Sequence, residues 1–266
     1  MFSIAASIII PLMPATVAET PATQPTSSYI VLIGDSIAEG HPAHHGRLHA
    51  ADGKFDPSHA DRPGQLGFEL AKQLGIRVLN QGIGGQSSLD VRKRWDRDVS
   101  GLSVDPGDGR GDRTLSESDV RPVAVYLHVG INDFSLRVPG DELRSNFIFF
   151  AERCRTEKIR LIVDNVGAEN DTRWFTAEVQ AAVHQFNRWL STDLKQLYPE
   201  ILIVDYCAWS TAGTRNLAIP NPEMFVDDVH PNEKGYADFA DFAAKQVRLL
   251  LKTPVLPSTP STRRSE

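Results

Sequence analysis

The sequence predicts an α/β protein with a parallel β-sheet that helices cover on both faces. Two observations support this fold class. Short apolar runs recur along the chain, and segments with the 3.6-residue periodicity of amphipathic helices lie between them. Strands that alternate with helices are joined by right-handed crossovers, which make neighbouring strands parallel within one sheet.

Five runs are predicted to be strands. The first, Tyr29–Ile33, is continuously apolar and ends at Gly34, as expected of a strand that is buried on both faces. Four similar runs follow at residues 77–80, 123–129, 159–163 and 201–205. The sequence therefore predicts a five-stranded parallel sheet.

Helical patterns fill the intervals between these runs. They cover residues 65–74, 88–99, 141–155 and 176–197. A last amphipathic stretch, residues 233–251, places four apolar side chains on one stripe, those of Phe239, Phe242, Val247 and Leu250. We expect these helices to form the outer layers.

The two ends of the chain differ in composition from its centre. Residues 1–18 contain no Asp, Glu, Lys or Arg, and the apolar run Ile4–Leu12 precedes small residues at positions 16–18, as in a secretory signal peptide. Residues 19–28 are predicted to be a polar linker and residues 253–266 a disordered tail, because both are rich in Pro, Ser and Thr. A single domain remains at residues 29–252, and we expect the protein to be secreted or periplasmic.

Composition excludes several classes of protein. The 266 residues include 28 Lys and Arg and 34 Asp and Glu, for a net charge of −6, and no basic block is present, so no nucleic-acid partner is expected. The apolar run near the N-terminus is shorter than the roughly 20 residues that span a membrane, so we expect no stable membrane insertion. Two cysteines exclude a Cys-rich zinc module. The sequence indicates no cofactor and specifies no oligomeric state.

Residues with catalytic chemistry follow the predicted strands, where ligands bind in parallel sheets. The first strand ends in Gly34-Asp35-Ser36, the second in the Gly-rich segment 80–87, and the third in the segment 130–133, which contains Asn132. Asp227 and His230 precede the last helix. Each motif alone is typical of a turn or a helix cap. Together they supply a nucleophile, oxyanion donors and a base with an orienting carboxylate.

These four blocks resemble those of the SGNH subgroup of the GDSL hydrolases, which are esterases and lipases of flavodoxin-like three-layer α/β/α fold. The resemblance extends from Tyr29 to about Leu251, and Ile37 stands where the GDSL motif has Leu. It implies that Ser36 is the nucleophile, His230 the base and Asp227 the residue that orients the base. It also implies an oxyanion hole formed by the backbone N–H groups of Ser36 and Gly85 and by the side chain of Asn132.

The expected function is therefore ester hydrolysis through an acyl-enzyme on Ser36, acting on a small-molecule or polysaccharide ester. The His-, Asp-, Arg- and Gly-rich loops favour short acyl groups, such as acetyl, on a carbohydrate or another polar alcohol. A lipase, phospholipase or thioesterase of the same family is the first alternative. A non-catalytic carbohydrate-binding protein on the same fold is the second. Asp228 is the alternative to Asp227 as the residue that orients the base. An α/β-hydrolase fold is disfavoured, because its elbow motif Gly-x-Ser-x-Gly needs Gly at residue 38, which is Ala here.

Three further features leave alternatives open. The loop His41–His59 holds five histidines and is interpreted as a solvated loop or a wall of the substrate cleft rather than a metal site. Cys154 and Cys207 are expected to be free thiols, with a disulfide as the alternative. Trp174 and Trp209, in predicted loops, are placed either to stack on a sugar ring or to fix their own loops.

Overall fold

The structure is a computed structural model that describes residues 29–41, 61–102 and 121–253. The predicted signal peptide (1–18), the polar linker (19–28) and residues 254–266 of the predicted tail lie outside the described residues. So do residues 42–60 of the His-rich loop, which include His44, His45 and Asp56. The assignment of those segments therefore stays a prediction.

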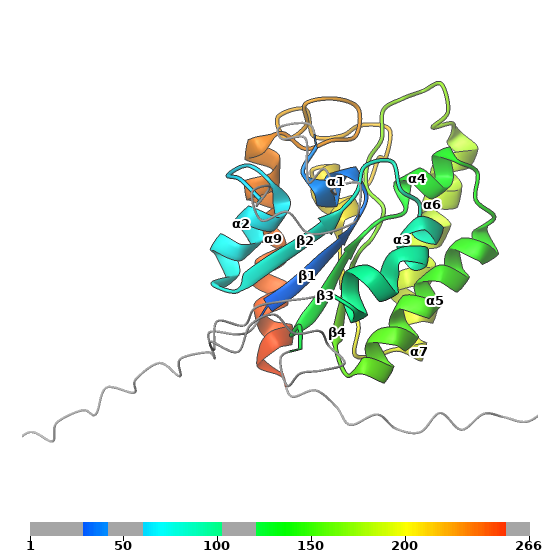
Figure 1. Cartoon of the computed structure of the whole chain (residues 1–266). Coiled ribbons are helices and arrows are strands. Elements are labelled where there is room, and N and C mark those ends of the chain that lie inside the picture. Colours follow the sequence, from blue (N-terminus) through cyan, green and yellow to red (C-terminus); the bar gives the residue numbers. More distant parts are fainter. Residues whose placement is uncertain (1–28, 42–60, 103–120, 254–266) are drawn as a thin grey trace, which may run out of the picture.

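A five-stranded, all-parallel sheet forms the centre of the molecule (Figure 1). Its strands are β1 (Tyr29–Gly34), β2 (Arg77–Gly82), β3 (Ala124–His128), β4 (Arg160–Asp164) and β5 (Leu202–Val204), in the order β2-β1-β3-β4-β5. The predicted fold class and all five predicted strands are confirmed. Strand β1 lies between β2 and β3, and its last residue, Gly34, pairs with Gly82 of β2 and His128 of β3.

Both faces of the sheet are buried, which explains the continuous apolar runs. In β1 the side chains of Tyr29, Val31 and Ile33 enter one hydrophobic core, while Ile30 and Leu32 enter the other. Successive side chains of a strand point to opposite faces, so a strand between two helical layers needs apolar residues at every position.

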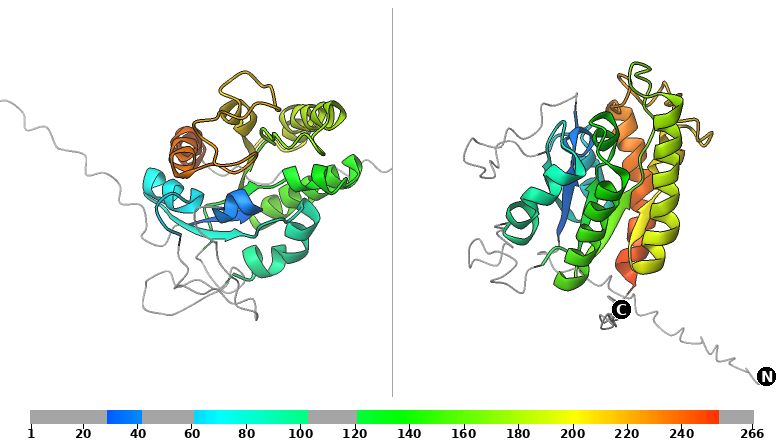
Figure 2. Two further views of the ribbon diagram at one scale, coloured as in Figure 1. Left: turned by 90° about the horizontal axis from the view of Figure 1, so that it is seen from above. Right: turned by 90° about the vertical axis from the view of Figure 1, so that its right-hand side faces the viewer.

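The first core, which contains Tyr29, Val31 and Ile33, is covered by helices from the middle of the chain (Figure 2). They are α3 (Ser88–Trp95), α5 (Gly140–Glu157) and α6 (Ala177–Trp189). Single π-helical turns at Asp96–Ser100 and Leu190–Leu194 continue α3 and α6, and α7 (Lys195–Leu197) follows the second turn. Aromatic contacts join α5 and α6, because the Phe147 and Phe186 ring centroids lie 5.0 Å apart.

The second core lies under helices from both ends of the domain. Helices α1 (Ser36–Glu39), α2 (Leu66–Leu74), α8 (Tyr206–Ser210) and α9 (Glu233–Lys252) contribute to it. The predicted stripe on α9 is confirmed, since Phe239 and Val247 are fully buried and Phe242 and Leu250 pack against the same core. Among the described residues no helix is long and apolar enough to cross a membrane.

Three short helices were not predicted, namely α1, α8 and α4 (Ile131–Ser135). Each has only four or five residues, which is too short for a helical period to be visible in sequence. Trp209 lies in α8 rather than in a loop, and its indole Nε1 donates to Asp238 Oδ2 at 2.8 Å. Its ring packs against Tyr206 and Phe239 in the core, so the possibility that it stacks on a sugar is wrong. Trp174 is half-buried and packs against the first core.

Candidate active site

Ser36 begins helix α1, just beyond the end of β1. The turn from β1 into α1, called the Ser36 turn below, is positioned by a close approach between the backbones of Gly34 and His128. A Cβ atom on Gly34 would lie 1.8 Å from the carbonyl oxygen of His128, so only glycine fits at this position. The next residue, Asp35, donates its backbone N–H to the same carbonyl (3.1 Å) and caps α1, because its Oδ1 accepts the N–H of Ile37 (3.0 Å). The Ser36 side chain is thereby held at the carboxyl edge of the sheet.

His230 and Asp227 lie in the loop before α9, and a second close contact brings them to Ser36. The Ser36 hydroxyl is 2.9 Å from Nε2 of His230, and Nδ1 of His230 is 2.8 Å from Oδ2 of Asp227. The loop closes on itself, since Val226 donates its N–H to the carbonyl of His230 at 3.0 Å. The structure therefore brings together the three residues that were predicted to form the catalytic group.

The local backbone distinguishes Asp227 from Asp228. Oδ1 of Asp227 accepts the N–H groups of Val229 (3.0 Å) and His230 (2.7 Å). Partial burial alone would raise the pKa of Asp227, but these two bonds and the His230 ring outweigh it and hold the pKa below its usual value. Asp228 instead accepts the N–H of Asn170 through its backbone carbonyl (3.1 Å). The geometry thus favours Asp227 as the partner of His230.

The Gly-rich turn after β2 passes beside Ser36. A Cβ atom on Gly84 would lie 3.7 Å from Cβ of Ser36, and one on Gly82 would lie 2.1 Å from the backbone nitrogen of Glu39. Gly85 has a φ of 74°, in the left-handed region that favours glycine. Asn80 fixes the start of the turn, because it donates to the carbonyl of Ala38 (2.7 Å) and accepts the N–H of Gly82 (2.7 Å).

Asn132 is the second residue of α4, which follows β3, and its side-chain amide is anchored on the same Gly-rich turn. Its Nδ2 donates to the carbonyl of Gln86, the residue after Gly85, at 3.0 Å. A side-chain amide has two N–H donors, so one remains for a ligand. The turn after β2 and the helix after β3 are therefore joined at the place where an oxyanion hole was predicted.

Asp133 is buried directly behind Asn132. Its carboxylate accepts the N–H (2.8 Å) and the hydroxyl (2.6 Å) of Ser88, at the start of α3. Ser88 in turn accepts from Nδ2 of Asn146 at 2.9 Å. Burial raises the pKa of Asp133 to about 6, although the bonds from Ser88 oppose this shift.

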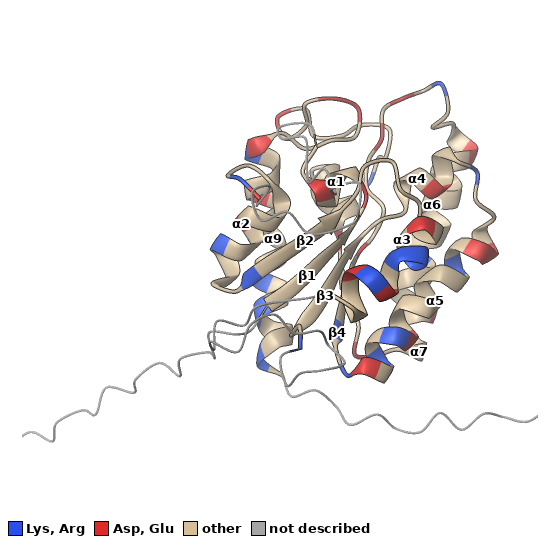
Figure 3. Ribbon diagram, viewed as in Figure 1, with Lys and Arg blue, Asp and Glu red and all other residues tan. Residues whose placement is uncertain are grey.

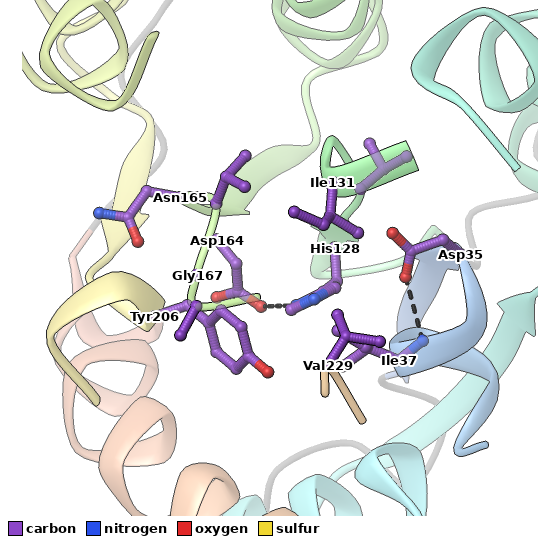
Figure 4. Close-up of a pocket in the computed structure, with 12 residues that line it drawn as sticks. Asp35, Ile37, His128, Ile131, Asp164, Asn165, Gly167, Tyr206 and Val229 are labelled. Atoms are coloured by element: carbon purple, nitrogen blue, oxygen red, sulfur yellow. Dashed lines mark hydrogen bonds and ion pairs between the residues drawn. The ribbon is translucent and has the colours of Figure 1, made fainter. Parts of the chain in front are cut away.

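A buried polar cluster lies beneath the Ser36 turn (Figure 4). Nδ1 of His128 is 2.6 Å from Oδ2 of Asp164, whose Oδ1 accepts the hydroxyl of Tyr126 at 2.8 Å. Burial alone would lower the pKa of His128, but Asp164 and the charge of Asp35 raise it. The adjoining cavity is lined by Asp35, His128 and Tyr206 among others, and its volume is about 10 Å³. One water molecule needs about that volume, so this cavity has no room for an acyl chain.

Sequence reasoning did not identify His128 or Asp164 as residues that support the site. The available signal was a polar residue inside a strand buried on both faces, as with His128 in β3, because such a residue needs a buried partner. His41, the one described residue of the predicted His-rich loop, lies against His230 with ring centroids 4.5 Å apart.

The described residues include two cysteine thiols but no cluster that could bind a metal ion. Within residues 29–41, 61–102 and 121–253, no group of three or more His, Cys, Asp or Glu side chains is arranged to hold a metal ion. Cys154 and Cys207 are both buried free thiols, in agreement with the expectation for them. Burial raises the pKa of Cys207 to about 11.

Solved structures of similar fold include proteins named as esterases and lipases. A GDSL-like lipase from Bacteroides thetaiotaomicron is 20% identical, with 85% of this chain and 88% of that chain covered and a TM-score of 0.56. A variant of an acetyl-xylooligosaccharide esterase from Geobacillus Stearmophilus is 18% identical, with 87% and 97% covered and a TM-score of 0.56. An acetyl xylan esterase is 17% identical, with 82% and 99% covered and a TM-score of 0.57.

The family is established by comparing the sequence with known protein families rather than by the fold. Among curated proteins none matches this chain at a significant level. The profile of the GDSL-like lipase/acylhydrolase family, in contrast, matches residues 32–237, which include the end of β1, the Gly-rich turn, Asn132 and the Asp227–His230 loop. The chain belongs to the GDSL-like lipase/acylhydrolase family and is a carboxylic ester hydrolase.

Proposed function

We propose that the protein is a serine esterase that releases short acyl groups, chiefly acetyl, from a carbohydrate or another polar alcohol. The observation that carries the proposal is the hydrogen-bonded series from Ser36 through His230 to Asp227, at the carboxyl edge of the sheet. A serine hydroxyl is a weak nucleophile unless a base lies within hydrogen-bond reach, and the distance of 2.9 Å to His230 meets that requirement.

In the proposed first step, Ser36 Oγ attacks the ester carbonyl while His230 takes the hydroxyl proton. Asp227 holds the ring with Nε2 toward Ser36 and stabilises the imidazolium that forms. The tetrahedral intermediate then expels the alcohol, which receives the proton from His230, and an acyl-enzyme remains. Water, activated by the same histidine, releases the acid and restores Ser36.

The oxyanion of the intermediate needs donors aimed at it. We assign this role to the backbone N–H groups of Ser36 and Gly85 and to the second N–H of Asn132. The approach of the Gly-rich turn to Ser36 and the anchoring of the Asn132 amide on Gln86 support the assignment. Removal of one such donor typically costs about 10²–10³ in kcat.

The surroundings of the site support a neutral, polar leaving group. Acidic positions are seen in the segments beyond the carboxyl ends of the strands (Figure 3). Glu39 ends α1, and Asp227 and Asp228 lie in the loop that carries His230. Arg173 balances the charge of Asp171 (2.5 Å), but the two adjacent carboxylates in the His230 loop disfavour phospholipid headgroups and nucleotide thioesters relative to a sugar hydroxyl. Two proteins of similar fold are an acetyl xylan esterase and an acetyl-xylooligosaccharide esterase, which agrees with this choice of substrate class.

We also propose that the protein is exported, because residues 1–18 have the composition of a signal peptide. Expression of the full chain with a C-terminal tag, followed by cell fractionation and intact-mass measurement, tests this. We expect an extracytoplasmic product that begins at Glu19. A full-length product confined to the cytoplasm would contradict the proposal.

Hydrolysis of p-nitrophenyl acetate, butyrate and octanoate by the wild type, Ser36→Ala and Ser191→Ala tests the proposed activity. Ser191 is an exposed serine on the π-helical turn after α6, and its substitution controls for loss of a hydroxyl elsewhere. We expect turnover that falls steeply beyond acetate, disappears in Ser36→Ala and persists in Ser191→Ala. Acetate release from acetylated xylan is the next assay. Turnover that rises with chain length would favour the lipase or thioesterase alternative, and binding of glycans without any turnover would favour the binding protein.

A further inference from the structure

A buried arginine lies at the centre of the segments that carry the proposed oxyanion donors. Arg94 belongs to α3, and its side chain is only 7% exposed. Its Nη2 donates to the carbonyl of Gly34 (2.8 Å), its Nη1 to the carbonyl of Gln81 (2.7 Å), and its Nε to Oε1 of Gln86 (2.5 Å). One guanidinium therefore joins the end of β1, the end of β2 and the residue after Gly85.

Each of these acceptors is close in sequence to a proposed oxyanion donor. Gly34 precedes Ser36 by two residues, and Gln81 and Gln86 lie on either side of the turn that contains Gly85. Gln86 also accepts the amide of Asn132 through its backbone carbonyl (3.0 Å). Small displacements of Arg94 would therefore move all three donors relative to one another.

The charge of the guanidinium is balanced within the same helix. Oδ2 of Asp98 accepts from Nη1 of Arg94 at 2.7 Å, and Asp98 is also bound by Arg97 from the surface side. A guanidinium presents five N–H donors in a rigid plane, whereas lysine presents a single ammonium on a flexible stem. Lysine at position 94 would keep the charge next to Asp98 but could not serve all three segments at once.

We propose that Arg94 is a positioning residue that holds the Ser36 turn, the Gly85 turn and Asn132 in the arrangement needed to stabilise the oxyanion. The inference rests on the proposed serine esterase function. It extends that function to a residue that does not itself contact the substrate and acts through the carbonyl groups of Gly34 and Gln81 and the side chain of Gln86.

The test compares Arg94→Lys with Arg97→Lys, a matched control in which an arginine that binds the same Asp98 is 49% exposed. Steady-state kinetics on p-nitrophenyl acetate are measured per folded chain, with folding checked by circular dichroism. We expect Arg94→Lys to lower kcat by about 10²-fold, the typical cost of a displaced catalytic group, and to change KM by less than about threefold. Arg97→Lys is expected to stay within about twofold of the wild type, since its side chain is half exposed.

A double-mutant cycle separates positioning from general loss of structure. If Arg94 acts through the oxyanion donors, the two losses will not multiply. The kcat of the double variant Arg94→Lys, Asn132→Ala will then be at least about tenfold higher than the value expected from multiplying the two single losses. Should Arg94→Lys fail to fold, Gln86→Leu replaces it in the same cycle, because this change removes the Nε acceptor and keeps the backbone carbonyl.

The outcomes distinguish this inference from the proposed function. A folded wild type without Ser36-dependent turnover would overturn the proposed function, and this inference with it. Ser36-dependent turnover in the wild type, together with an unchanged kcat in folded Arg94→Lys, or with multiplicative losses in the cycle, would overturn the role of Arg94 alone.

Discussion

The carboxylate of Asp133 accepts both the backbone N–H and the hydroxyl of Ser88, which is 45 positions earlier in the chain. This pair ties the segment that carries Asn132 to the start of α3, directly beyond the Gly85 turn. Because the carboxyl is buried, its pKa is raised to about 6 from the ordinary value of 3.8. The contact that organises the site therefore titrates in a range that can be measured.

The first prediction concerns stability and pH. Between about pH 4 and pH 6 the folded protein holds a proton on Asp133 that the unfolded chain has released, so the free energy of unfolding falls as pH rises through this range. The full shift corresponds to about 3 kcal/mol, of which the interval from pH 4.5 to pH 7 covers about 2 kcal/mol. Urea unfolding of the wild type and Asp133→Asn at pH 4.5 and pH 7 measures it. We expect the wild type to lose more stability than the variant over this interval, and equal losses would show that Asp133 does not titrate there.

The second prediction separates two adjacent carboxylates. Asp227→Asn removes the charge that faces Nδ1 of His230, and this change typically costs about 10⁴ in kcat in enzymes with this arrangement. Asp228→Asn keeps the backbone carbonyl that accepts from Asn170, so its kcat should stay within about threefold of the wild type. Steady-state kinetics on p-nitrophenyl acetate decide between them. A large loss in Asp228→Asn alone would reverse the assignment.

The third prediction addresses the side-chain donor of the proposed oxyanion hole. Asn132→Ala should lower kcat by about 10²–10³ and leave KM nearly unchanged, because the donor acts on charge that develops only in the transition state. The isosteric Asn132→Asp should be at least as damaging, since an ionised carboxylate can only accept hydrogen bonds and would repel the oxyanion. Recovery of activity in Asn132→Asp would contradict this role.

The fourth prediction tests the close backbone approach at the Ser36 turn. Gly34→Ala forces a methyl group to within 1.8 Å of the His128 carbonyl, so β1 and β3 must separate, and we expect a loss of about 3 kcal/mol or more in the free energy of unfolding. Gly140→Ala in the first turn of α5 is the matched control, because a Cβ atom there meets nothing within 4 Å. Thermal and urea unfolding compare the two, and equal stability would show that the strands can adjust.

The fold class, the succession of strands and helices along the chain and the polar residues at the strand ends could all be predicted from the sequence. These features are visible because burial on both faces requires apolar residues at every position of a strand such as β1, and because amphipathic periodicity marks helices such as α9. The motif spacing likewise pointed to Ser36, Asn132 and His230 before any contact between them was known.

Contacts between residues that are distant in the sequence became visible only in the folded chain. The resemblance already favoured Asp227 over Asp228, and in the folded chain Asp227 contacts Nδ1 of His230 at 2.8 Å. The fold alone places Trp209 in the core and brings Arg94 to the carbonyl of Gly34 across 60 positions of the chain. Such pairings depend on how strands and helices pack, and the local pattern of polar and apolar residues does not contain that information. Burial and hydrogen-bond geometry, which exist only in the folded chain, assign the partners.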